Sequence, residues 1–315
     1  MSILICGSLA YDTLLTFDGT FDDHLLPDQL HKLSVCFRVP QLRREFGGCA
    51  GNIAYSLRLL GGEPLIMATV GADFAPYRAH LNRLGIASSH IREIPDTYTA
   101  QCFITSDRAD NQITAFHPGE RVVASQNHAH SAQGMRLAIV APSGHPAAMQ
   151  FCRELTAMGT PFVFDPGQEL PLFSAEELLE LTGTASYITL NDYESELLTH
   201  RTGLSLAALA DRVEALVVTR GGKGSDLYAE GQHWHIPAAP ADALTDPTGC
   251  GDAYRAGLLF AREQGWDWLA AARLASVVGA IKMGHKGAQN HPLAASDIAQ
   301  RFTAAYGVDC PLPHP

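Results

Sequence analysis

The chain has 315 residues, a formal net charge of −11 at pH 7, and 46% hydrophobic against 17% charged residues. This length and composition favour one large hydrophobic core with a small added element over two full domains. The acidic balance argues against a nucleic acid polymer or an anionic membrane surface as the main partner, because both attract clustered Lys and Arg.

The cysteines and the first residues indicate an intracellular protein. Seven cysteines are scattered along the chain without a Cys-x-x-Cys pair, which is typical of reduced thiols. Residues 1–6 lack a basic leader and a cleavage site, and no uncharged apolar stretch approaches the length of a membrane span. We therefore expect a cytoplasmic protein that binds no membrane.

Short apolar runs rich in Ile, Val and Phe alternate with stretches of helical spacing. The runs predict strands at residues 3–6, 65–70, 137–140, 162–164, 187–190 and 216–218. Helical spacing appears at residues 148–158, 175–181 and 193–200. This alternation predicts an α/β fold whose parallel sheet is covered on both faces, with the site at the carboxyl ends of the strands.

A second pattern predicts a small additional sheet. Residues 33–39, 100–105 and 113–116 alternate apolar and polar side chains, as antiparallel strands with one solvated face do. We interpret these segments as strands inserted at about residues 13–44 and 97–119. The sheet either closes over an active site as a flap or pairs two subunits, and one surface could serve both purposes.

Two histidine pairs are candidates for metal binding. His128 with His130, and His233 with His235, would each place two imidazoles on one face of a strand. Neither pair has a third ligand close by in the sequence. We therefore expect solvated histidines rather than metal sites.

The first candidate ligand contacts lie around the predicted helix that ends at residues 61–62. Asp12 offers a carboxylate that can bind a vicinal diol, although it fits a turn equally well. Gly47 and Gly48 permit close approach of a ligand to the backbone, and Asn52 offers both a donor and an acceptor for hydroxyl groups. A tight contact between helix and sheet explains the same glycines equally well.

Two later motifs suit a nucleotide. Asn191 and Glu194 combine an amide with a carboxylate that could hold the waters of Mg²⁺, but they also fit a helix cap. Thr219, Gly221 and Gly224 form a glycine turn after a strand, which suits phosphates or ribose and equally suits a hairpin. Walker A, dinucleotide-binding and nucleophile-elbow motifs do not occur in the sequence.

The most informative motif occupies residues 246–252. Gly249 and Gly251 directly precede a helical pattern, where free backbone amides can bind an anion. Asp252 at the same point would repel a phosphate unless it faces a hydroxyl that attacks that phosphate. The pairing predicts phosphoryl transfer to an alcohol, whereas an Asp alone would only complement the helix dipole, which should also keep it ionised.

Taken together, these motifs resemble the ordered signature set of the ribokinase (PfkB-type) carbohydrate kinase family, over nearly the whole chain. The resemblance implies a ribokinase-like α/β fold in a single domain over residues 1–315, with a mostly parallel sheet, helices on both faces and a small β-sheet lid. It implies that Asp252 is the general base and that the amides of Gly249, Cys250 and Gly251 form the hole for the γ-phosphate.

The resemblance also implies the cofactors. Asn191 and Glu194 would organise the phosphates and Mg²⁺, with Glu194 contacting the ion through water. The residues of the glycine turn would contact ATP: Thr219, Gly221 and Gly224. Family members often bind a monovalent cation such as K⁺, and the matching positions are Asp246, Thr248 and Gly287. The sequence departs from the family pattern at two positions, with Pro247 for the usual Thr and Cys250 for the usual Ala. Both departures leave the backbone donors of the anion hole intact, so they bear on the cation site and not on the anion hole.

Within the family, residues 7–12, 44–52, 112–119, 165–168 and 246–252 are similar to the bacterial nucleoside kinases, often labelled adenosine kinase. This likeness implies a nucleoside whose ribose lies against Asp12, Gly47, Gly48 and Asn52, with its 5′-hydroxyl toward Asp252. Phe103 or Phe116 would stack on the base, or both belong to the core of the flap. The alternatives are a kinase for ribose or fructose and a nucleoside-binding module without activity. A homodimer through the lid sheet is a further candidate.

Overall fold

The computed structural model describes residues 2–25, 31–32, 34–109, 111–119 and 126–312. Its body is a nine-stranded sheet in the order β13-β12-β11-β10-β9-β8-β1-β4-β5, parallel except at β12. The strands are β1 (Ser2–Cys6), β4 (Glu63–Gly71), β5 (Ile91–Ile94), β8 (Met135–Val140), β9 (Phe162–Phe164), β10 (Tyr187–Asn191), β11 (Ala215–Thr219), β12 (Ser225–Ala229) and β13 (Gln232–Ile236). All six apolar runs predicted as strands lie in this sheet.

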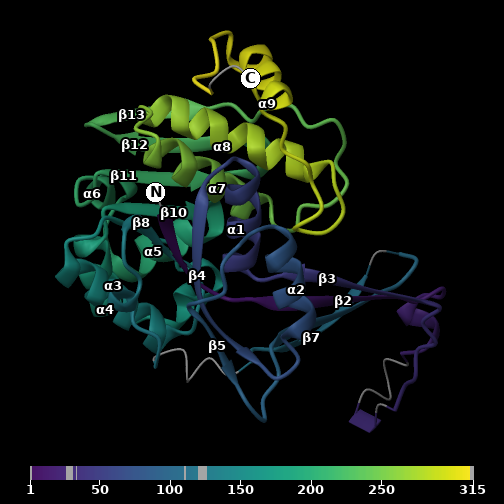
Figure 1. Cartoon of the computed structure of the whole chain (residues 1–315). Helices are drawn as coiled ribbons and strands as arrows, with labels where there is room; N and C mark the ends of the chain where they lie inside the picture. Colours follow the sequence, from purple (N-terminus) through teal and green to yellow (C-terminus); the bar gives the residue numbers. More distant parts are fainter. Residues whose placement is uncertain (1, 26–30, 33, 110, 120–125, 313–315) are drawn as a thin grey trace.

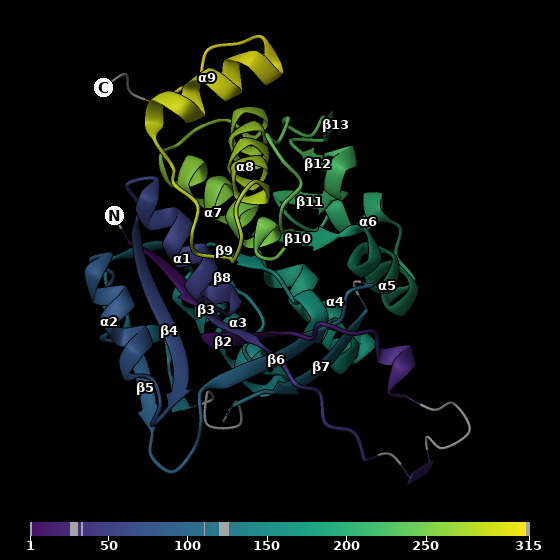
Figure 2. The ribbon, with the colours of Figure 1, turned by 90° about the vertical axis from the view of Figure 1, so that its right-hand side faces the viewer.

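Helices cover both faces of the large sheet, as Figures 1 and 2 show. One face carries α1 (Cys49–Leu59), α2 (Ala75–Arg83), α7 (Cys250–Glu263), α8 (Trp268–Met283) and α9 (Ala295–Tyr306). The other carries α3 (His145–Met158), α4 (Ala175–Thr184), α5 (Asp192–Thr202) and α6 (Leu206–Ala210). No helix in the described ranges is both long and apolar enough to cross a bilayer.

Alternation along β1 explains the two hydrophobic cores. Ile3 and Ile5 pack into the core beneath α1, α7 and α8, whereas Leu4 and Cys6 pack into the core beneath α3. Successive side chains of a strand point to opposite faces, so a strand covered on both sides is apolar throughout. The continuous apolar runs of the sequence therefore predicted the centre of the sheet well.

A separate four-stranded sheet, called the small sheet below, projects from the body (Figure 1). Its order is β3-β2-β6-β7, formed by β2 (Ala10–Thr16), β3 (Gln41–Gly47), β6 (Ala100–Ser106) and β7 (Gln112–His117). The predicted strands at 100–105 and 113–116 correspond to β6 and β7.

The strand predicted at residues 33–39 is wrong. Residue 33 lies outside the described residues, and residues 34–39 form no strand. Phe37 instead packs against Phe17 and Phe21, with ring centroids 5.1 Å from each. The apolar side chain thus belongs to an aromatic cluster, and β3 begins only at Gln41.

Strand register divides the small sheet into two faces. Asp12, Glu45, Cys102 and Phe116 form one row across the four strands, and this side is called the inner face. It borders a hollow of about 650 Å³ that also touches Thr245, Asp246 and Lys286. The opposite side, called the outer face, carries Leu15, Leu42, Phe103 and Ile113.

Candidate active site

The start of α7 presents two free backbone amides. Gly249 adopts a left-handed φ of +78°, and a β-carbon there would lie 2.7 Å from that of Ala288, so the position requires glycine. Among the described residues, the N–H groups of Gly249 and Gly251 have no hydrogen-bond partner. The N–H of Cys250 donates to the carbonyl of Pro247 at 3.1 Å. Of the three amides expected at this point, two are therefore available to an anion.

Asp252, in the first turn of α7, is held by a chain of hydrogen bonds. Nδ2 of Asn52 donates to its Oδ2 at 2.8 Å, and Nε2 of Gln289 donates to Oδ1 of Asn52 at 2.9 Å. The same Nε2 lies 2.7 Å from the hydroxyl of Tyr77, which donates to the carbonyl of Gly47 at 2.8 Å. Asn52, expected to bind a substrate hydroxyl, thus holds the carboxylate of Asp252, and Gln289 belongs to this network without any signal in the sequence.

Burial raises the pKa of Asp252 to about 6, while Arg255 and the hydrogen bond from Asn52 oppose the rise and Asp165 and Asp12 add to it. The carboxyl is therefore mostly ionised at neutral pH, as the helix dipole predicted, yet it is a stronger base than an exposed Asp. A carboxylate of this kind can accept a proton from a bound hydroxyl.

Arg255 is the main charged residue that sequence reasoning missed. Its Nη2 donates to Oδ1 of Asp165 at 2.6 Å and its Nε contacts Oδ2, with side chains 11% and 2% exposed. A β-carbon at position 251 would lie 2.7 Å from Nη1, so the guanidinium borders the start of α7. An Arg three residues after Asp252, within a buried helical run, was the available signal.

Asn191 and Glu194 form the capping box that was the alternative to a ligand site. Oδ1 of Asn191 accepts from the amide of Glu194 at 2.7 Å, and Oε2 of Glu194 accepts from the amide of Asn191 at 2.8 Å. Oε1 also accepts from Nδ2 of Asn191 at 2.9 Å. Burial and the charge of Asp165 raise the pKa of Glu194, while the Asn191 amide and Arg255 oppose the rise. The pair therefore lies in the same electrostatic network as Asp252.

The glycine turn and the start of α7 line one cleft of about 380 Å³. Thr219, Gly221 and Gly224 border it on one side, and Cys250 and Gly251 border it on the other. The turn also links β11 to the antiparallel β12, so the hairpin interpretation of these glycines is confirmed, and their contact with a nucleotide stays a prediction. Further residues of the lining are mostly apolar and include Ala238, Ala239, Leu244, Tyr254, Ala280 and Met283. A cleft of this kind suits an apolar ring with a polar end toward the amides.

The expected acceptor residues gather at the root of the small sheet. Burial raises the pKa of Asp12 to about 6, with the charges of Glu45 and Asp246 adding to the rise. A β-carbon at Gly47 would lie 2.5 Å from Oδ2 of Asp12, so this glycine leaves room for the carboxylate. Gly48 has a φ of +85°, and a β-carbon there would lie 2.5 Å from the carbonyl oxygen of Ser8. Phe116, 52% exposed, stands in the row of Asp12 on the inner face.

The residues expected to bind a monovalent cation are already bonded to one another. Oδ1 of Asp246 accepts from the amide of Thr248 at 2.9 Å, and Oδ2 accepts from the amide of Gly287 at 2.9 Å. Lys282, fully buried, donates from Nζ to the carbonyls of Asp246 at 2.6 Å and His285 at 3.0 Å. A fixed positive charge thus lies beneath the loop that leads to α7.

Comparison with known proteins places this site in a family. The model of the pfkB family carbohydrate kinases matches residues 13–295. A nucleoside kinase from Methanocaldococcus jannaschii is 31% identical over 257 residues, which is 81% of this chain and 84% of the relative.

Solved structures agree in fold over 98% of this chain. The nucleoside kinase of Burkholderia thailandensis in complex with inosine is 47% identical, has a TM-score of 0.87 and is covered to 99% by 98% of this chain. The same enzyme in complex with ADP-inosine is 48% identical, with a TM-score of 0.86 and coverage of 98% of this chain and 97% of that one. The ribokinase-like fold is confirmed. The chain belongs to the pfkB family of carbohydrate kinases and is a phosphotransferase that acts on an alcohol group.

Proposed function

We propose that the protein is a nucleoside kinase that transfers the γ-phosphoryl group of ATP to the 5′-hydroxyl of a nucleoside. One observation carries the proposal: an oriented carboxylate and two free amides meet at the start of α7, beside a cleft lined by the glycine turn. The name of the relative from Methanocaldococcus jannaschii and the inosine and ADP complexes of the relative from Burkholderia thailandensis support a nucleoside acceptor and an adenine nucleotide donor.

In this mechanism Asp252 is the general base. It accepts the proton of the 5′-hydroxyl late in the transfer, when that hydroxyl becomes acidic. The amides of Gly249 and Gly251 stabilise the charge on the transferred group, and the Arg255 guanidinium adds positive charge at the same point. The inner face of the small sheet holds the nucleoside, with its ribose near Asp12 and its base against Phe116, and excludes water.

The same proposal assigns the cations. Mg²⁺ neutralises phosphate charge when bound, and Glu194 suits a contact through water, because both of its carboxylate oxygens already accept from Asn191. Asp246 is engaged by Thr248 and Gly287, the positions expected for K⁺. We propose that the ammonium group of Lys282 supplies the positive charge there, so that K⁺ is not required.

A panel of acceptors tests the function. Adenosine, inosine, guanosine, cytidine, ribose and fructose are each offered with ATP and Mg²⁺, and ADP formation and the phosphorylated product are measured. We expect kcat/KM for the best nucleoside to exceed that for either sugar by at least about 100-fold, since the sugars lack the base contacts. A preference for ribose or fructose would support a sugar kinase. Tight nucleoside binding without ADP formation would support a module without activity.

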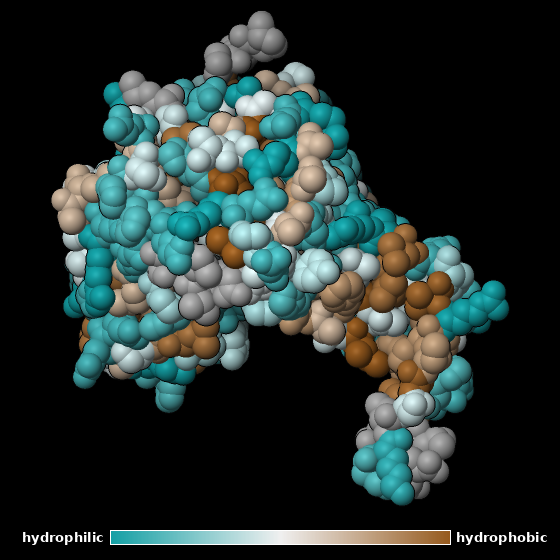
Figure 3. Space-filling view, turned by 60° about the horizontal axis from the view of Figure 1, so that its bottom comes forward, coloured by the Kyte–Doolittle hydropathy of each residue, from teal (hydrophilic) through white to brown (hydrophobic). Residues whose placement is uncertain are grey.

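We also infer that the outer face of the small sheet pairs two copies of the chain. Hydrophobic residues gather on the arm that this sheet forms (Figure 3), and Leu42, Phe103 and Ile113 are 67%, 40% and 45% exposed. A two-fold axis through this face would bring like residues together and bury them. The inner face would stay free for substrate, so the flap and the dimer surface are the two sides of one sheet.

A further inference from the structure

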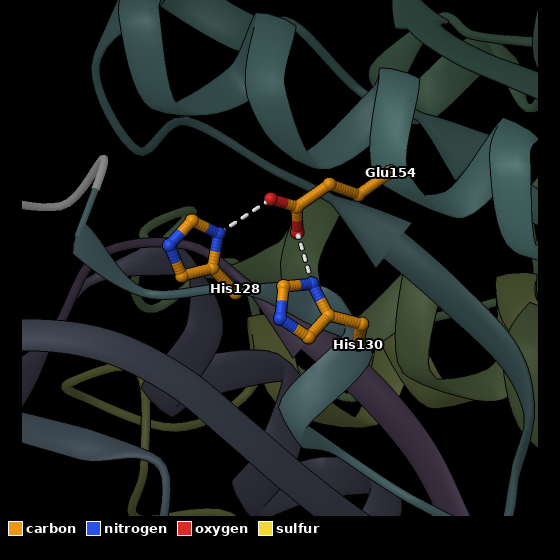
Figure 4. A group of neighbouring side chains, drawn as sticks. All are labelled: His128, His130 and Glu154. Carbon is orange, nitrogen blue, oxygen red and sulfur yellow. Dashed lines mark hydrogen bonds and ion pairs between the residues drawn. The ribbon is translucent and has the colours of Figure 1, made fainter.

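His128 and His130 lie beside a carboxylate that the sequence did not associate with them (Figure 4). Nδ1 of His128 is 2.6 Å from Oε1 of Glu154, and Nδ1 of His130 is 3.9 Å from Oε2. His128 directly precedes the short turn η4 (Ala129–Ser131), His130 lies within it, and Glu154 projects from α3. The sequence showed no third candidate ligand near this pair, because the carboxylate that lies beside it comes from a different element.

We propose that His128, His130 and Glu154 form a binding site for a divalent transition metal ion of the zinc class. Two imidazole nitrogens and one carboxylate oxygen are a donor set that Zn²⁺ and Co²⁺ accept, with water in the fourth position. Ligand atoms of the three side chains lie within 4.8 Å of one another. The side chains of His128 and His130 are 47% and 64% exposed, so an ion and its water can reach the site.

The geometry requires only small movements. Ligand atoms on a tetrahedral ion at Zn–N and Zn–O distances of about 2.1 Å lie roughly 3.4 Å apart. The contact between His128 and Glu154 would lengthen from 2.6 Å, and that between His130 and Glu154 would shorten from 3.9 Å. Both changes are below about 1 Å. One ligand atom from each of the three residues lies within 4.8 Å of the others, so the largest closing movement is from 4.8 Å to roughly 3.4 Å, which rotamer shifts of the exposed histidines can supply.

Gln150 holds the same carboxylate. Its Nε2 donates to Oε1 of Glu154 at 2.8 Å and to the carbonyl of Asn127 at 3.0 Å, so both of its hydrogens have acceptors. The Nδ1 of His128 therefore faces the carboxylate at 2.6 Å as its hydrogen-bond partner. An ion between this nitrogen and the carboxylate would take the place of the shared proton.

Glu154 is held in place before an ion binds. The Ala129 amide donates to Oε2 at 2.6 Å, which fixes the carboxylate against the turn. A ligand that is oriented before the ion arrives loses less freedom on binding.

The second histidine pair offers a matched control. His233 and His235 on β13 also lie 3.6 Å and 2.9 Å from a carboxylate, that of Asp226. Nε of Arg220 donates to the same carboxylate at 2.6 Å, so a positive charge already occupies that position. The described residues contain one His/Cys/Asp/Glu group of metal-binding size, and it is the one at Glu154.

Titration of the full chain with Co²⁺, without a tag and after removal of metals with EDTA, tests the proposal. Visible d–d absorption reports His ligation, and Zn²⁺ is then added to displace Co²⁺. The variants are His128→Asn with His130→Asn, Glu154→Gln, and the control His233→Asn with His235→Asn. We expect wild type and control to bind one ion, and the other variants to bind it at least about tenfold more weakly. Kinase kcat without added Co²⁺ or Zn²⁺ should be unchanged in all of them, because none of these residues lines the active site.

Melting temperature in EDTA shows whether each variant is folded. A folded His128/His130 variant with wild-type Co²⁺ affinity would overturn the proposal. So would loss of the signal in the His233/His235 control, or a wild-type titration without His-dependent absorption. Zn²⁺ should also raise the melting temperature of wild type and not of the Glu154→Gln variant, since a ligand that binds only the folded state stabilises it.

Discussion

Arg255 brings a buried positive charge next to Asp252, and the shape of its guanidinium group matters as well as its charge. The guanidinium holds Asp165 by two nitrogens, which a lysine cannot reproduce. We expect Arg255→Lys to lower kcat by about 10- to 100-fold, with a smaller change in KM for ATP, because the charge at the start of α7 moves.

Arg301 provides the control for that substitution. It also binds a carboxylate, that of Asp242, through two nitrogens at 3.0 Å and 2.6 Å, but far along the chain on α9. Steady-state kinetics of Arg301→Lys should match wild type. Equal kcat in Arg255→Lys and wild type, with the melting temperature also unchanged, would remove Arg255 from the site.

Lys282 predicts how the enzyme responds to monovalent cations. Because its ammonium group already binds the carbonyls of Asp246 and His285, exchange of K⁺ for tetramethylammonium should change kcat of wild type by less than about twofold. Lys282→Ala should lower kcat by about tenfold or more, and K⁺ or NH₄⁺ should restore part of it by entering the vacated space.

A structural role alone would not give that rescue. The measurement is kcat of both proteins against the concentration of each salt at constant ionic strength. Strong K⁺ dependence of wild type would contradict the assignment of Lys282, and a K⁺ ion at Asp246, Thr248 and Gly287 would then be the better proposal.

The two faces of the small sheet can be tested separately, because each carries one exposed Phe. Phe103 stands on the outer face and Phe116 on the inner face, 40% and 52% exposed. Phe103→Asp should dissociate a dimer, since a charge would replace apolar surface at the centre of the contact. Phe116→Ala should leave the dimer intact and raise KM for the nucleoside by about 10-fold, through loss of stacking on the base.

Light scattering after size exclusion and steady-state kinetics separate the two effects. A wild-type protein that is monomeric at all concentrations would contradict the dimer, and so would a dimeric Phe103→Asp variant. An unchanged nucleoside KM in Phe116→Ala would place the base elsewhere.

The strands also show which parts of the fold could be predicted from the sequence. Strands buried on both faces were predictable, because β1, β8 and β10 read as continuous apolar runs. The strands of the small sheet were harder to predict. Residues 34–39 alternate apolar and polar side chains like a strand, but Phe37 packs into an aromatic cluster. In contrast, β3 carries the charged residues Arg43, Arg44 and Glu45, so its sequence resembles a loop. Gln289 and Glu154 contact partners far away in the chain, so no local pattern indicates their roles. For Arg255 the only local signal was its position three residues after Asp252, because its main partner, Asp165, lies far away in the chain.

At the scale of the whole molecule, the raised pKa of Asp252 links activity to stability. A carboxyl that binds its proton more tightly in the folded chain opposes folding once it ionises. The rise of the Asp252 pKa from 3.8 to about 6 lowers the free energy of unfolding by about 3 kcal/mol above pH 6. The loss is smaller where solvent screens the charge. This cost disappears as the pH falls toward 4, where the carboxyl is protonated in the folded chain and half protonated in the unfolded one.

Asp252→Asn should therefore be more stable than wild type near neutral pH, by about 1–3 kcal/mol, with the gain shrinking near pH 4. The new amide can still accept the hydrogen bond from Asn52. Urea unfolding at the two pH values measures the difference. A variant that is less stable than wild type at neutral pH would show that the ionised carboxyl is stabilised by Arg255 more than burial penalises it.

Turnover of the same Asp252→Asn variant tests the central claim most directly. With a nucleoside accepted by wild type, we expect kcat to fall by about 10²- to 10⁴-fold, because the hydroxyl loses its proton acceptor. Binding of ATP and nucleoside should stay within about threefold of wild type, since the asparagine keeps the shape of the site. Near-normal kcat in the folded variant would contradict the assignment of Asp252 as the base and the mechanism that depends on it.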